Sequence, residues 1–291
     1  MHRGRLPLLA AIAPIAAAVL ALSPSAAAGD ERATHYYLSL GDSYAAGTQP
    51  IPEPPFQADT DEGYADQLHA LLAVEDPKLR LVKLGCAGES TVSMRAGDPS
   101  PAEDLASDCG TPSFYANRYP HKTQLAEAVS FLHAHRGKVS VVTIDIGIND
   151  VAGPSGPGPI AENLPAILAE LRAAAGPGVP IVGMNYPAVF LPLPWAEGGM
   201  PALQATVALV VGVNDYIESF FESAEAPVAD VESAFSVTDF TLVDGTPLNV
   251  LRACQWSWWC NWVPPDVHPN TAGYGVIAQA FAEALRRAGT D

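Results

Sequence analysis

The sequence of 291 residues fits one large domain or two smaller ones, at about 100–200 residues per domain. Its 15 lysine and arginine residues against 32 aspartate and glutamate residues leave a formal net charge of −17. Nucleic acid is therefore a poor partner, because phosphate contacts need clustered positive charge. The hydrophobic share of 48% excludes a largely disordered chain, because enough apolar surface is present to offset the entropy lost on folding.

The first 28 residues have the organisation of a secretory signal peptide. Two arginines open the chain, an apolar run follows as far as Leu22, and small residues lead to Ala28. We therefore predict export, with cleavage after Ala28. An uncleaved membrane anchor is the alternative, but the apolar run contains two prolines and is short for a span of about 17–25 residues. The mature chain, residues 29–291, is expected to be one secreted domain without a stable membrane span.

Export would place the four cysteines in an oxidising compartment, where an even number predicts disulfides. Of the three pairings that are possible, we expect the sequence-local one, which joins Cys86 to Cys109 and Cys254 to Cys260. Zinc is disfavoured, because no two cysteines are separated by two residues and no histidine lies at ligand spacing from a cysteine. We expect neither a metal nor an organic cofactor.

Five apolar runs are predicted to be β-strands, and helical patterns separate them. The strongest run, Val139–Ile146, is β-branched nearly throughout, as expected of a strand that is buried on both faces. The other runs are Tyr36–Leu40, Leu79–Leu84, Val179–Met184 and Pro227–Val231, and the helical patterns are Gly63–Leu72, Lys122–Ala134, Ala161–Ala175, Pro201–Phe221 and Ala272–Arg287. This alternation predicts right-handed crossovers and a parallel sheet that helices cover on both faces.

Four short motifs lie where the predicted strands end or where the last helix begins. In an open parallel sheet the active crevice lies past the carboxyl ends of the strands, where strand order reverses. The motifs are Gly41-Asp42-Ser43 after the first strand, Gly88 after the second, Gly147-Ile148-Asn149-Asp150 after the third and His268-Pro269-Asn270 before the last helix. Each motif alone is weak, but all four in this order are hard to attribute to chance.

The residue types in these motifs are those that ester hydrolysis needs: a nucleophile, a base and donors for an oxyanion. Ser43 at the head of a helix is the candidate nucleophile, and an ordinary helix-cap serine is the alternative. His268 is the only one of seven histidines in a motif that suits a base, although it could also be a turn residue. The backbone N–H groups of Ser43 and Gly88 and the side-chain amide of Asn149 would form the oxyanion hole.

Together the motifs resemble those of the SGNH, or GDSL-type, hydrolase family, over about residues 36–285. The resemblance implies a flavodoxin-like three-layer α/β/α sandwich with a five-stranded parallel sheet. It also implies a secreted esterase or lipase, a serine ester hydrolase that acts through an acyl-enzyme on a small-molecule, lipid or carbohydrate ester. A carbohydrate O-deacetylase of the same fold and a non-catalytic secreted binding protein are the alternatives.

The last motif departs from the family pattern, in which an aspartate three residues before the histidine orients the ring. Pro265 occupies that position here, and Asp266 lies only two residues before His268. Either a main-chain carbonyl near Pro265 or the Asp266 carboxylate would accept the Nδ1–H of the ring, which requires one acceptor. We slightly favour the carbonyl, with Asp266 as the second candidate.

Four tryptophans precede the last motif, at Trp256, Trp258, Trp259 and Trp262. They form either an aromatic wall for an acyl chain or a sugar, or a packed cover over the expected Cys254–Cys260 disulfide.

Overall fold

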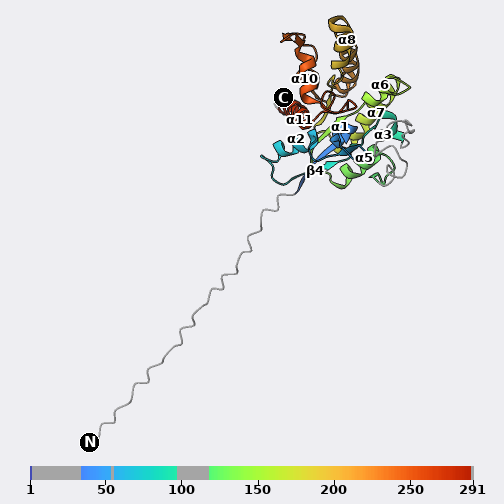
Figure 1. Cartoon of the computed structure of the whole chain (residues 1–291). Helices are drawn as coiled ribbons and strands as arrows, with labels where there is room; N and C mark the ends of the chain where they lie inside the picture. The colour runs from blue at the N-terminus through green and yellow to red at the C-terminus, as the bar shows by residue number, and fades with distance from the viewer. Residues whose placement is uncertain (2–33, 54–55, 97–117, 290–291) are drawn as a thin grey trace. The chain divides into compact units, whose positions relative to one another are not determined.

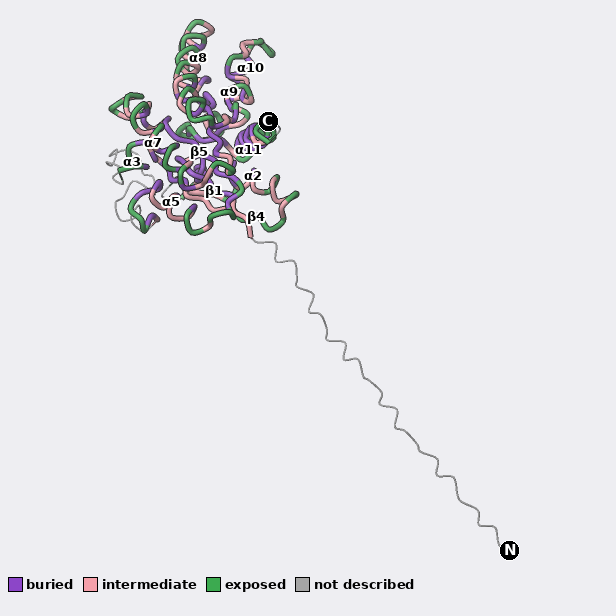
Figure 2. Tube along the Cα trace, turned by 180° about the vertical axis from the view of Figure 1, so that it is seen from behind, coloured by how far each residue is buried: buried purple, intermediate pink, exposed green. Residues whose placement is uncertain are grey.

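The computed structural model describes Met1 and residues 34–53, 56–96 and 118–289. A sheet of five parallel strands forms the centre, made of β1 (His35–Gly41), β4 (Leu79–Lys83), β5 (Val139–Asp145), β6 (Ile181–Met184) and β7 (Val228–Ala229). All five predicted strands are confirmed, with ends that differ by no more than two residues. The central strands β1 and β5 are buried along most of their length (Figure 2). Ser140 is the one exposed residue of β5.

The strands are arranged in the order β4-β1-β5-β6-β7. Counted along the chain within this sheet, that is the 2-1-3-4-5 order of flavodoxin-like folds, in which the order reverses beside the first strand. The reversal lies between β1 and β5, so the loops that follow these two strands flank the crevice where such folds bind ligands.

Helices cover both faces of the sheet (Figure 1). On one face α2 (Tyr64–Leu72) packs against α11 (Thr271–Ala288), where the Tyr64 and Phe281 rings stack with centroids 4.7 Å apart. On the other face lie α3 (Thr91–Ala96), α5 (Gln124–Ala134) and α7 (Gly158–Ala175), which contact one another. The predicted three-layer α/β/α sandwich is therefore confirmed.

Helix α8 (Pro192–Ser223) is longer than predicted, because a first helical segment precedes Pro201 and Gly199 interrupts the helical backbone between the two parts. Of the helices that the structure describes, it alone has the length and apolar composition that would suffice to cross a membrane. Its Leu203, Ile217 and Phe221 side chains are buried in the core of the domain.

Several short elements were not predicted from the sequence. They are α3, α6 (Ile148–Ala152), α9 (Val231–Ala234), α10 (Leu248–Trp256), the hairpin of β2 (Thr48–Pro50) with β3 (Gln57–Asp59), and the hairpin of β8 (Leu242–Val243) with β9 (Thr246–Pro247). The helix expected to begin at Ser43 is present as the short α1 (Ser43–Ala46). The α10 segment has a buried face, formed by Asn249, Val250 and Ala253, but no helix was predicted from the sequence in this run of nine residues. Tertiary contacts hold it, and the buried Asn249 amide donates to the Val237 carbonyl at 2.9 Å.

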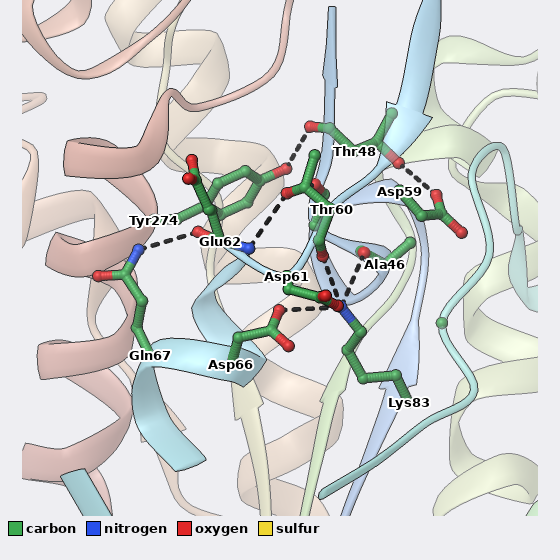
Figure 3. Close-up of polar contacts among 12 residues, drawn as sticks. Ala46, Thr48, Asp59, Thr60, Asp61, Glu62, Asp66, Gln67, Lys83 and Tyr274 are labelled. Carbon is green, nitrogen blue, oxygen red and sulfur yellow. Dashed lines mark hydrogen bonds and ion pairs between the residues drawn. The ribbon is translucent and has the colours of Figure 1, made fainter. Parts of the chain in front are cut away.

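Polar contacts fix the β2–β3 hairpin against the rest of the domain (Figure 3). The Nζ of Lys83, at the end of β4, donates to the Thr60 carbonyl at 2.6 Å and to Asp66 of α2 at 2.9 Å. From the α11 side, the Tyr274 hydroxyl donates to the Thr48 carbonyl at 2.8 Å. The hairpin is therefore held between the edge strand β4 and the last helix.

Two carboxyl groups are buried where β1 and β5 end, those of Asp42 and Asp145. The strands approach so closely here that a Cβ on Gly41 would lie 2.1 Å from the Asp145 carbonyl oxygen. Gly41 also has a φ of +133°, which favours glycine. No other residue type fits this position without displacing β5.

Buried hydroxyl and N–H groups bind both carboxyls. Asp42 accepts from the Tyr44 N–H at 2.9 Å and from the Tyr186 hydroxyl at 2.8 Å. Asp145 accepts from the Tyr64 hydroxyl at 2.6 Å and from the Ala45 N–H at 3.2 Å. Burial raises the pKa of each carboxyl, and the neighbouring charge of Asp42 raises the pKa of Asp145 further.

We expect the free energy of unfolding to fall as the pH rises above about 4, because native Asp145 keeps its proton to a higher pH than the unfolded carboxyl does. The native state then binds more protons than the unfolded state. Asp145→Asn removes this titration, so the stability of the variant should fall less than that of the wild type as the pH rises from about 4 to above neutrality. Urea unfolding across this range measures the difference.

The control for this experiment is Asp244→Asn, at an exposed position in the β8–β9 turn. It should follow the wild-type pH dependence. Parallel pH profiles for wild type and Asp145→Asn would contradict the raised pKa.

Candidate active site

Ser43 is the first residue of α1, and the N–H groups around it are almost all occupied. The Asp42 N–H donates to the Asp145 carbonyl at 3.1 Å, while the N–H groups of Tyr44 and Ala45 donate to the two buried carboxyls. The Ala46 N–H donates to the Asp42 carbonyl at 3.1 Å. Among the described residues none accepts from the Ser43 N–H. Of the N–H groups from Asp42 to Ala46, it is therefore the one left for a ligand.

Gly88 lies in the loop between β4 and α3 with a φ of +80°, which favours glycine. Its N–H also has no acceptor within the part of the chain that the structure describes. Two residues earlier, Cys86 is buried and disulfide-bonded. Its predicted partner, Cys109, lies outside the described residues.

Asn149 lies in the first turn of α6, after the end of β5. Its Nδ2 donates to the Glu89 carbonyl at 2.9 Å, which leaves the second N–H of the amide for another acceptor. The adjacent Asp150 accepts from the N–H and the hydroxyl of Thr91, at 2.8 and 2.5 Å. Burial raises the pKa of Asp150. These bonds tie the loop that carries Asn149 to the loop that carries Gly88.

His268 and Asp266 form a buried pair before α11. The Nδ1 of His268 lies 2.8 Å from the Oδ1 of Asp266, and the same oxygen accepts from the His268 N–H at 2.9 Å. Burial opposes ionisation of Asp266, but the hydrogen bonds and charge of His268 outweigh it, so the pKa of this carboxyl is lowered. The Nε2 of His268 and the Oγ of Ser43 have no hydrogen-bond partner among the described residues.

This geometry corrects our preference for a main-chain carbonyl near Pro265, because the Asp266 carboxylate occupies the acceptor position at Nδ1. A spacing of two residues suffices because the carboxylate folds back onto the N–H of His268 in an Asx turn. The turn brings the Asp266 side chain to the His268 ring at a spacing of two residues, where the family pattern has a spacing of three.

Two side chains that the sequence did not single out connect these groups. The Tyr44 hydroxyl donates to the Val267 carbonyl at 3.0 Å, and its ring centroid lies 6.1 Å from that of His268, so it joins the Ser43 helix to the His268 loop. Gln57 of β3 donates to the outer oxygen of Asp266 at 2.6 Å. The sequence carried no signal for Gln57, because 209 positions separate the partners.

Part of the tryptophan segment packs against the His268 loop and supports it. Trp258 donates its backbone N–H to the His268 carbonyl at 3.0 Å and its ring N–H to Gln49 at 3.0 Å. The predicted Cys254–Cys260 disulfide is confirmed, with its Cα atoms 5.0 Å apart. The Trp259 ring instead lies 6.4 Å from that of Phe190, in the loop after β6.

The site thus combines a serine hydroxyl, a histidine oriented by a carboxylate, and three N–H donors that lack a full set of partners in the described part of the chain. This is the set of groups that acyl transfer requires. Within the described ranges no group of three or more histidine, cysteine, aspartate and glutamate side chains is arranged to hold a metal ion.

Several solved structures share this fold. A putative GDSL-like lipase from Parabacteroides merdae is 15% identical, with a TM-score of 0.54 over 87% of this chain and 96% of that chain. The carbohydrate acetylesterase Est24 from Sinorhizobium meliloti is 15% identical, with a TM-score of 0.52 over 87% and 99%. The aryl esterase from M. smegmatis is 16% identical, with the same TM-score and coverage.

No curated protein matches the sequence. Residues 39–276 match the model of the GDSL-like lipase/acylhydrolase family, and this range includes Ser43, Gly88, Asn149, Asp266 and His268. The match covers most of the chain and agrees with the position of every motif around the site. The chain therefore belongs to the GDSL-like lipase/acylhydrolase family.

Proposed function

We propose that the protein is a secreted carboxylic ester hydrolase that forms an acyl-enzyme on Ser43. The observation that carries this proposal is the pattern of N–H groups around Ser43, in which neighbouring donors are bound while the N–H of Ser43 itself has no acceptor among the residues that the structure describes. Membership of the GDSL-like lipase/acylhydrolase family supports ester hydrolysis in general.

In the first half-reaction the Ser43 hydroxyl attacks the carbonyl carbon of the ester while His268 Nε2 takes its proton. Asp266 at Nδ1 keeps the ring in the tautomer whose Nε2 accepts, and stabilises the imidazolium that forms. The N–H groups of Ser43, Gly88 and Asn149 then bind the oxyanion of the tetrahedral intermediate. His268 returns the proton to the leaving alkoxide, which departs as the alcohol.

In the second half-reaction a water molecule attacks the acyl group on Ser43. His268 takes a proton from this water and later gives it to the Ser43 oxygen as the acid leaves. The same three donors bind the second tetrahedral intermediate. No group beyond these side chains is needed to balance the reaction.

A carbohydrate O-deacetylase is the second candidate. The favouring observation is the half-buried Trp259, which lies beside Phe190 in the segment next to His268. Such aromatic faces suit the apolar face of a sugar ring as well as an acyl chain. The similar fold of Est24, a carbohydrate acetylesterase, agrees with this candidate.

We expect the protein to hydrolyse p-nitrophenyl esters, and Ser43→Ala to lower kcat by at least about 1000-fold because the nucleophile is lost. Steady-state rates across esters from acetate to palmitate measure this. A strong acetate preference, together with acetate release from an acetylated polysaccharide, would select the deacetylase. Undiminished hydrolysis by Ser43→Ala would overturn the mechanism, and an inactive wild type would favour a binding protein.

Asp266→Asn should lower kcat by at least about 100-fold with little change in KM, because the new amide favours the wrong tautomer of His268. The exposed variant Asp244→Asn should keep the wild-type kcat. A loss below about tenfold, or about 1.4 kcal/mol, would contradict the role of Asp266 in orienting the ring.

Secretion rests on the order of basic, apolar and small residues before Ala28 and on the Cys254–Cys260 disulfide. Expression of the full chain in a secreting host should release a protein into the medium whose N-terminal sequence begins at Gly29. A protein that stays with the membrane fraction and retains residues 1–28 would contradict this.

A further inference from the structure

Gln124 is the first residue of α5, and it is completely buried. Thr123 caps the helix by accepting from the Ala126 N–H at 2.9 Å, which fixes where the helix begins and where Gln124 lies. A buried primary amide is costly unless its donors and acceptor are paired. The partners of this amide are Tyr119 and two of the three segments that supply the candidate oxyanion donors, those of Ser43 and Gly88.

The first segment is the end of β1. Gln124 Oε1 accepts from the Gly41 N–H at 2.6 Å, and its Nε2 donates to the Gly41 carbonyl at 2.9 Å. On this side of β1 the ladder with β4 ends at Ser39, so the amide takes the place of a neighbouring strand. These two bonds fix the backbone of Gly41, which lies two residues before Ser43.

The second segment is the loop that carries Gly88. The same Nε2 donates to the buried Glu89 carboxylate at 2.9 Å, and the Glu89 carbonyl accepts from Asn149 Nδ2 at 2.9 Å. The Gly41 carbonyl also accepts from the Cys86 N–H at 3.0 Å, two residues before Gly88. One side chain therefore connects the chain segments of all three donors.

We propose that Gln124 is a positioning residue, which holds the N–H groups of Ser43, Gly88 and Asn149 at the spacing that a tetrahedral oxyanion requires. This inference rests on the proposed function, because it concerns the transition state of the same reaction. Gln124 touches no reacting atom. It acts through the backbone of Gly41 and through Glu89.

The test replaces Gln124 by methionine, which keeps the length of the side chain and removes its hydrogen bonds. For a soluble p-nitrophenyl ester, Gln124→Met should lower kcat by about 100-fold with KM within about threefold, because a displacement of about 1 Å at a catalytic group costs this much. The inhibition constant of phenylboronic acid, which forms a tetrahedral adduct with a serine hydroxyl, should rise by a similar factor. A purely structural role would lower the melting temperature of the protein and leave kcat, measured below that temperature, unchanged.

Gln67→Met is the matched control. Gln67 of α2 also joins two backbone carbonyls, those of Glu62 at 2.9 Å and Thr271 at 2.8 Å, but neither belongs to a donor segment (the Glu62 contact is shown in Figure 3). This variant should lose stability and keep kcat within about threefold of wild type. If Gln124→Met does not fold, Gln124→Glu carries the test, because it keeps the bond to the Gly41 N–H and can donate to no more than one of Gly41 and Glu89.

The outcomes separate this inference from the proposed function. An active wild type, an inactive Ser43→Ala and folded Gln124 variants with reduced kcat and weaker boronic acid binding support both. Folded Gln124 variants with wild-type kcat and boronic acid binding overturn the positioning role alone. A wild type without esterase activity, or an active Ser43→Ala, overturns the proposed function and the inference with it.

Discussion

The close approach of β1 and β5 at their carboxyl ends is the constraint on which the site depends. A side chain on Gly41 would overlap the Asp145 carbonyl, so the strands can approach this closely only because Gly41 has no Cβ. The approach lets the Asp42 N–H reach Asp145 and places the Asp145 carboxylate over the first turn of α1. Strand order reverses at the same point, which is where folds with this strand order bind their ligands.

Burial of the Asp42 and Asp145 carboxyls costs stability, but it also determines which N–H groups near Ser43 are bound. Burial of two neighbouring carboxyls raises their pKa values and makes stability depend on pH. In return they bind the N–H groups of Tyr44 and Ala45, which would otherwise compete with the Ser43 N–H for the same ligand. The pattern fits the general observation that functional sites break local rules of stability that the surrounding fold supports.

A second set of contacts reaches the site from the periphery. Lys83 and Tyr274 fix the β2–β3 hairpin, and the hairpin brings Gln57 to Asp266 and Gln49 to the ring N–H of Trp258. The His268 loop is therefore held from outside by the hairpin and from inside by the Tyr44 hydroxyl. The β2–β3 hairpin and α1 thus decide how the Asp266–His268 pair is held.

The sequence by itself determined the order and type of the main elements and the positions of Ser43, Gly88, Asn149 and His268. These follow from local information: apolar runs such as Val139–Ile146, helical periods, and motif residues at strand ends. Only the tertiary structure decided what orients His268 and which side chains join the donor segments. Gln124 contacts Gly41 over 83 positions and Gln57 contacts Asp266 over 209. Such pairs leave no period or spacing in the chain, because a hydrogen bond between distant segments depends on how the sheet and its loops pack and not on any local pattern.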